Sequence, residues 1–135
     1  MKVLVDTNVV LSAALRNRLP ERVILHIGTR EEWIWLTTPE ILSEYLNVLA
    51  RPKFALPPDV LKLWSDVVQG RTICVTTPPA LDFARDPKDA PFLAAALATS
   101  ADYLITGDAD LFHAQPSLQT RVISVVDFAA LFEIE

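Results

Sequence analysis

The chain has 135 residues, 51% of them hydrophobic, and its 17 acidic residues outnumber 12 basic ones to give a net charge of −5 at pH 7. This length and composition predict a single domain, residues 1–135, and exclude a disordered chain. The negative charge argues against a general nucleic-acid coat protein. It does not exclude a nuclease, because a bound cation reverses the local charge of an acidic site.

The single cysteine, Cys74, stands in an apolar run and is expected to be a small buried side chain. One cysteine forms no intrachain disulfide, which fits a reducing compartment. No apolar run is long enough to cross a membrane, and Asp6 comes too early for the apolar region of a secretion signal. We therefore expect a cytoplasmic protein that has no membrane partner.

The first predicted element is a strand over residues 3–5, because an unbroken apolar run (Val-Leu-Val) suits a strand buried on both faces of a parallel sheet. Asp6 follows at its carboxyl end, where open α/β sheets place their ligands. Asn8 is the expected cap of a short helix over residues 9–15. For Asp6 alone, a turn or cap role is equally compatible with the sequence.

The rest of the chain alternates apolar strands with amphipathic or capped helices. This alternation, with one long helical insertion in the first half, predicts an α/β fold with a mostly parallel sheet and helices on both faces. The predicted helices cover residues 20–28, 38–50, 59–69, 92–98 and 126–132, and the predicted strands cover residues 33–37, 72–76, 103–106 and 122–125.

Four acidic residues fall at positions that this fold would bring together. Asp6 and Asp108 end two predicted strands, and Asp89 stands at the start of an alanine-rich helix. Glu44 borders the apolar face of its helix, whereas Glu40 lies further round toward solvent, counting about 100° per residue. If the two strands are neighbours, all four acids line one cleft at the carboxyl edge of the sheet.

Four carboxylates in one cleft repel one another and raise their own pKa values unless a cation is present. Hard divalent cations with oxygen ligands are the natural solution, and Mg²⁺ usually keeps several waters and takes one or two carboxylates directly. Such a site suits phosphodiester hydrolysis, because the metal polarises a phosphoryl oxygen and lowers the pKa of the attacking water.

Each acid also has a simpler structural explanation. Asp86 or Asp89 could cap its helix, and for Asp86 capping is the preferred interpretation. Asp108 follows Gly107 and could be a turn residue. Asp110 is expected to be a solvated or capping acid.

Four stretches of the chain together resemble the PIN-domain family and, within it, the VapC-like toxins of type II toxin–antitoxin systems. They are residues 5–8, 43–54, 86–96 and 101–108, in the order that the family has them. The resemblance implies a three-layer α/β/α fold and Mg²⁺- or Mn²⁺-dependent endonucleolytic cleavage of single-stranded RNA. It also implies a homodimer that a small antitoxin protein silences by blocking the cleft.

The resemblance assigns roles to individual positions. The family's catalytic acids match Asp6, Glu44, Asp89 and Asp108, of which the three aspartates are the expected metal ligands. Asn8 and Thr106 match polar positions that support the acids. Independently, basic side chains in three loops next to these elements are candidates for RNA contacts, unless they are ordinary surface charges: Arg16, Arg18, Arg51, Lys53, Arg85 and Lys88.

Other functions fit the sequence less well. A phosphatase of the haloacid-dehalogenase type needs a second Asp two residues after the first, where this chain has Asn8. A receiver-type signalling module needs a Lys after a late strand, and the strands after Asp108 offer none. The intact acidic set argues against a PIN fold used for binding alone. A PIN nuclease of RNA processing or decay, without a toxin role, stays open as an alternative.

Overall fold

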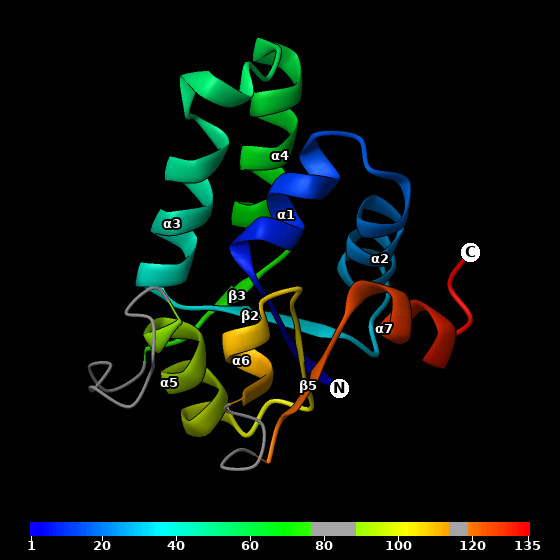
Figure 1. Ribbon diagram of the computed structural model, residues 1–135. Helices are drawn as coiled ribbons and strands as arrows, with labels where there is room; N and C mark the ends of the chain where they lie inside the picture. Colours follow the sequence, from blue (N-terminus) through cyan, green and yellow to red (C-terminus); the bar gives the residue numbers. More distant parts are fainter. Residues whose placement is uncertain (77–88, 114–118) are drawn as a thin grey trace.

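The computed structural model describes residues 1–76, 89–113 and 119–135. A parallel sheet with the strand order β3-β2-β1-β4-β5 forms its centre, and helices flank the sheet in a three-layer α/β/α arrangement (Figure 1). The predicted fold class is therefore confirmed, with a sheet that is parallel throughout the described ranges. The strands are β1 (Lys2–Val5), β2 (Ile34–Thr37), β3 (Ile73–Cys74), β4 (Tyr103–Ile105) and β5 (Arg121–Ile123).

The described helices include all the predicted ones, and in two of them the side chain of the N-cap residue accepts a backbone hydrogen bond. The Thr38 hydroxyl accepts a hydrogen bond from the backbone N–H of Ile41 at 3.2 Å, and Pro39 occupies the first turn. Ser124 caps the last helix in the same way. The helices are α1 (Thr7–Ala14), α2 (Arg18–Thr29), α3 (Pro39–Leu49), α4 (Pro58–Gly70), α5 (Ala90–Thr99), α6 (Ala109–His113) and α7 (Val125–Leu131), with a 3-10 turn η1 (Pro52–Phe54).

Strand β1 is the central strand, as its apolar run predicts. Val3, Leu4 and Val5 have no exposed surface, and β1 pairs with β2 on one side and with β4 on the other. Val5 stands opposite Ile105 in the register of β1 and β4. The residues that follow these two strands therefore emerge side by side at the carboxyl edge of the sheet.

Helix α3 is tied to the end of β1 by a buried side chain. Tyr45 is completely buried, and its hydroxyl donates a hydrogen bond to the carbonyl oxygen of Val5. Burial also raises the pKa of the Tyr45 hydroxyl, so that it stays protonated and able to donate. The preceding residue, Glu44, is thereby held close to the end of β1.

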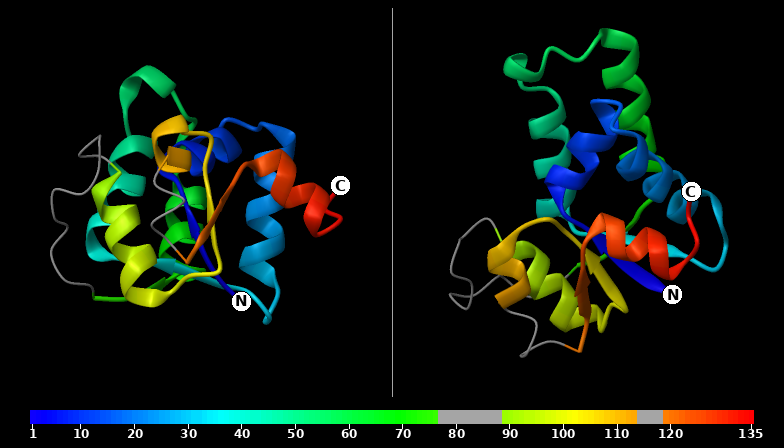
Figure 2. Two further views of the ribbon diagram at one scale, coloured as in Figure 1. Left: turned by 60° about the horizontal axis from the view of Figure 1, so that its bottom comes forward. Right: turned by 45° about the vertical axis from the view of Figure 1, so that its right-hand side comes forward.

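Helices α3 and α4 stand side by side and are joined at their far end by η1 (Figure 2). This pair forms the helical insertion that the sequence predicts in the first half of the chain. Among the described helices, none has the length and apolar character that a membrane span requires.

Three local predictions need correction. Cys74 is exposed, because it lies in β3 at the edge of the sheet, where both residues of the strand are exposed. Helix α1 begins at Thr7 with Asp6 in the N-cap position, so Asn8 lies in the first turn and is not the cap. The final strand stops at Ile123, because the next residue serves as a helix cap.

Candidate active site

The site is built on a hydrogen-bonded link between the ends of β1 and β4. Thr106 has no exposed surface, and its hydroxyl donates to Asp6 Oδ2 at 2.8 Å. The same hydroxyl oxygen accepts a hydrogen bond from the backbone N–H of Asp108 at 3.0 Å. Thr106 thus fixes the carboxylate of Asp6 relative to the loop that carries Asp108.

Asp6 is a buried carboxylate beside a second acid. Its side chain is 8% exposed, and burial raises its pKa above the ordinary value, with a further increase from the charge of Asp108. The Thr106 hydrogen bond opposes this increase, as do the nearby N–H groups of Thr7 and Asn8. Neither N–H makes a regular capping bond with the carboxylate. A cation at this point would favour the ionised form.

Asp89 occupies the N-cap position of α5, but its backbone does the capping. The Asp89 carbonyl oxygen accepts hydrogen bonds from the N–H groups of Phe92 and Leu93, both at 3.1 Å, while the carboxylate makes no capping bond. The side chain is 5% exposed. Side-chain capping of α5 therefore does not account for the acid at this position.

Three carboxylates converge where α5 meets the loop after β4. One oxygen each of Asp89, Asp108 and Asp110 lies within 4.8 Å of the others. The carboxylate of Asp108 also accepts a hydrogen bond from the backbone N–H of Asp110 at 2.8 Å, so its predicted turn role is correct as well. Asp110, expected to be a solvated or capping acid, belongs to this acidic group. An all-oxygen donor set of this kind fits a hard divalent cation.

All four predicted acids line a single cleft of about 450 Å³. They come from four places in the fold: Asp6 from the N-cap of α1, Glu44 from α3, Asp89 from the N-cap of α5, and Asp108 from the loop after β4. Glu44 is half-buried, whereas Glu40 is exposed and does not line the cleft. The helical angle read from the sequence therefore places both glutamates as the structure has them.

The other end of the cleft is basic and aromatic. It is lined by Arg51, Lys53 and Phe54 from the segment between α3 and α4. Both cations are exposed, and neither forms an ion pair within the described ranges. Glu44 and Arg51 are seven residues apart, which corresponds to about 10 Å along a helix. The acidic and basic side chains thus occupy different parts of one cleft.

The remaining predicted basic residues are not part of this surface. Arg16 lines separate hollows beside α4, and Arg18, at the start of α2, does not line the cleft. Arg85 and Lys88 lie outside the described residues, as does Asp86. Of the three loops expected to ring one cleft, the structure places the Arg51–Lys53 loop there.

One further polar group in the cleft was not anticipated from the sequence. Thr7 is 4% exposed, and its hydroxyl has no hydrogen-bond partner among the described residues. A buried hydroxyl without a partner is uncommon in folded proteins, and it is readily explained by a group that binds beside it. Its position directly after Asp6, in the first turn of α1, is the signal that could have identified it.

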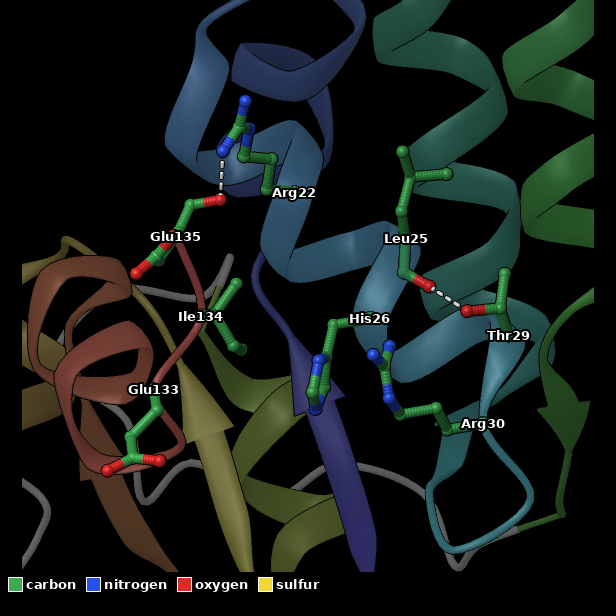
Figure 3. Close-up of a pocket in the computed structure, with 8 residues that line it drawn as sticks. All are labelled: Arg22, Leu25, His26, Thr29, Arg30, Glu133, Ile134 and Glu135. Atoms are coloured by element: carbon green, nitrogen blue, oxygen red, sulfur yellow. Dashed lines mark hydrogen bonds between the residues drawn. The ribbon is translucent and has the colours of Figure 1, made fainter.

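A second charged hollow lies on a different part of the molecule. It is lined by Arg22 and His26 from α2, by Arg30 directly after α2, and by Glu133 and Glu135 from the segment after α7 (Figure 3). Arg22 donates a hydrogen bond to the backbone carbonyl of Glu135. Because basic and acidic side chains line this hollow together, it lacks the concentrated negative charge that a divalent cation requires.

Comparison with known proteins identifies the family. Residues 2–110 match the PIN domain family, and the chain therefore belongs to it. PIN domains are generally nucleases and typically bind divalent metals. The crystal structure of PAE2754 from Pyrobaculum aerophilum is similar in fold, with a TM-score of 0.59 and 21% identity over 98% of this chain and 90% of that chain. At this identity the likeness shows the fold alone. No curated protein matches the chain significantly.

Replacing Thr106 with valine should weaken both metal binding and catalysis. Valine removes the hydroxyl that holds Asp6 and the N–H of Asp108, and losing such an outer partner typically costs about 10- to 100-fold in metal affinity or activity. Thr106→Ser keeps the hydroxyl and should stay within a few-fold of wild type. The measurement is Mn²⁺ affinity by calorimetry. Equal affinities for the valine and serine variants would show that the link has no role at the site.

Proposed function

We propose that the protein is a divalent-metal-dependent endoribonuclease that cleaves single-stranded RNA. The observation that supports it most is the convergence of four acids, from four separate parts of the chain, in one cleft. Membership of a family of nucleases gives this acidic cleft a reaction to perform. Purified protein with Mn²⁺ should cut single-stranded RNA internally and leave the matched duplex intact. Failure to cut either RNA would contradict the proposal.

The acidic end of the cleft holds the metal in this proposal. Asp6, Asp89 and Asp108 are the proposed ligands of Mg²⁺ or Mn²⁺, and Asp110 is a fourth candidate because of its closeness to two of them. When bound, such a cation polarises the phosphoryl oxygen and lowers the pKa of the attacking water. The unpartnered hydroxyl of Thr7 adds a hydrogen-bond donor at the same place.

The remaining roles belong to side chains of α1 and α3. Glu44 orients the attacking water and accepts its proton, because it lines the cleft from α3, whereas the aspartates line it from other elements. Asn8, exposed in the first turn of α1, donates a supporting hydrogen bond to the substrate. Tyr45, anchored to the end of β1, keeps α3 at a fixed distance from the aspartates.

Removing both Arg51 and Lys53 by alanine substitution should weaken RNA binding similarly for all RNA sequences. Each cation that contacts a phosphate releases counterions, and for single strands each contact contributes about 0.7 to the slope of log affinity against log salt. The double variant should therefore flatten that slope by roughly 1.4. RNA affinity is measured across a salt series in chelator, where cleavage does not interfere.

A matched control for this double variant is available on α4. Lys62→Ala removes an exposed lysine that pairs with Asp66 and does not line the cleft, so it should leave the slope unchanged. If the double variant keeps both the affinity and the salt slope of wild type, the loop between α3 and α4 does not contact the RNA backbone.

We also propose that this nuclease is a homodimeric cytoplasmic toxin, silenced by a small antitoxin protein. The support is the resemblance of four stretches of the sequence to such toxins. Induced expression of the wild type should stop growth, and expression of the Asp6→Asn variant should not. Normal growth despite RNA cleavage in vitro would instead favour a PIN nuclease of RNA processing or decay.

A further inference from the structure

We propose that Phe54 forms a nucleobase subsite, in which one unpaired base stacks on the aromatic ring away from the site of cleavage. This inference rests on the proposed ribonuclease function and adds a binding position where a separate hollow adjoins the cleft. It also gives a physical reason for a preference for single-stranded RNA, because a base must leave its duplex before it can stack on a protein side chain.

Phe54 stands between the cleft and a second, apolar hollow of about 390 Å³. Among the residues that the structure describes, it alone lines both of them, so that the two spaces adjoin at Phe54. The hollow has mostly apolar walls, and Arg16 is the charged residue among those described that line it. A strand of RNA that leaves the acidic end along α3 meets this ring next.

The backbone on both sides of the hollow is held in place. On one side, η1 is closed by a hydrogen bond from the N–H of Phe54 to the carbonyl of Arg51 at 3.1 Å, and Ala55 follows with a left-handed φ of 49°. This conformation is unfavourable for a non-glycine residue, and such strain is commonly found at functional sites. On the other side, Arg16 follows α1 with a φ of 66°.

The Arg16 backbone is fixed by the hydrogen bonds that end α1. Its N–H donates to the carbonyl of Ala13, and the N–H of Asn17 donates to the carbonyl of Ser12, both at 3.0 Å. Glycine is the usual residue at this left-handed position. Here the position carries an arginine, which lines the apolar hollow together with Phe54. An Arg guanidinium also stacks on bases, so it can form the second wall of a base site.

The charges around Phe54 fit a nucleotide better than an apolar protein segment. The Lys53 ammonium lies 5.0 Å from the centre of the Phe54 ring, and Arg51 lines the same end of the cleft. Aromatic rings flanked by cations are the usual means by which proteins bind single strands, since the ring stacks on a base and the cations contact phosphates. Because every base has an aromatic face, this subsite should accept all four bases.

The first test measures the affinity of Phe54 variants for a short single-stranded RNA in excess EDTA. Phe54→Leu retains an apolar side chain but loses the ring, and it should weaken binding about tenfold, within the roughly 5- to 150-fold expected for one stacked base. Phe54→Trp should bind within about twofold of wild type. Leu63→Ala is the control, because it alters an exposed apolar side chain on α4 outside both spaces.

The second test uses wild-type protein and RNAs that each lack one base. An abasic position that removes the stacked base should weaken binding by wild type about tenfold. The same abasic RNA should cost Phe54→Leu almost nothing, because the ring is already absent. If the Phe54→Leu variant and the wild-type protein bind the intact RNA with equal affinity, the subsite is overturned. The same result is expected if the hollow binds a protein segment instead of a base. If no single abasic position weakens RNA binding by the wild-type protein, the subsite is overturned as well. This second outcome does not depend on whether the Phe54→Leu variant folds.

These results are separable from the test of the ribonuclease function. The affinities are measured without metal, whereas cleavage requires Mn²⁺ or Mg²⁺ in the proposed reaction. RNA cleavage by wild type together with unchanged affinity of Phe54→Leu would overturn the subsite alone.

Discussion

Replacing either Asp6 or Asp89 with asparagine should abolish most RNA cleavage, by at least about 100-fold, while the fold stays intact. Even outer partners of metal ligands contribute about 10- to 100-fold, and these two carboxylates are proposed to bind the metal directly. Asparagine is as good a helix cap as aspartate, so both N-cap positions keep a suitable residue. Asp59→Asn is the control, because Asp59 is exposed in the first turn of α4 and does not line the cleft.

The Asp6→Asn variant should also be more stable than wild type in the absence of metal. The pKa of Asp6 is raised above 3.8 in the folded protein, so ionisation of this group opposes folding. That penalty is absent at low pH and grows as the pH rises from about 3.8 through the raised folded pKa. Asparagine carries no such penalty, and its advantage should therefore be largest at neutral pH and shrink on acidification.

Thermal unfolding in chelator at a series of pH values measures this difference. If both the Asp6 and Asp89 variants melt well below wild type at neutral pH, the two acids are structural, and their assignment as metal ligands is wrong. The pH series separates that outcome from a general loss of stability, because a structural defect would persist at low pH.

Glu44→Gln should reduce cleavage by about 10²- to 10⁴-fold, the usual contribution of a group that transfers a proton, while Glu40→Gln should stay within about twofold of wild type. The two residues lie one turn apart on α3, but Glu44 lines the cleft and Glu40 is exposed. The pair is a matched test, because the same change is made twice on one helix. The steady-state rate of cleavage of one RNA is measured for both variants. An equal loss of activity in both would show that the catalytic face of α3 is assigned wrongly.

Those elements of the site that a single local sequence pattern determines could be predicted from the sequence. The apolar run of β1 specifies a strand buried on both faces, and Thr38 followed by Pro39 specifies where α3 begins. The apolar face of α3 also determines the directions in which Glu44 and Glu40 point, because a packed helix cannot rotate without exposing that face. These predictions needed no knowledge of the other elements.

Other features depend on how distant segments meet, and the sequence does not encode them locally. Strands β1 and β4 pair with each other although most of the chain separates them in the sequence. The hydrogen bond from Thr106 to Asp6 could therefore be expected only on the assumption that these strands are neighbours. The directions of loops carry no periodic signal, which is why Arg16 and Arg51 were grouped in one cleft and the structure separates them. Helix α6 is too short to show a helical pattern, and Asp110 was therefore not placed beside Asp108.

The most direct test of the central claim, that the acids of the cleft form a divalent-metal site that cleaves RNA, is a cleavage assay on protein stripped with EDTA. We expect no cleavage of single-stranded RNA in excess EDTA and full recovery when Mn²⁺ is added beyond the chelator. The Asp89→Asn protein, taken through the same steps, should recover little or nothing. Cleavage that continues undiminished in excess EDTA would contradict the account.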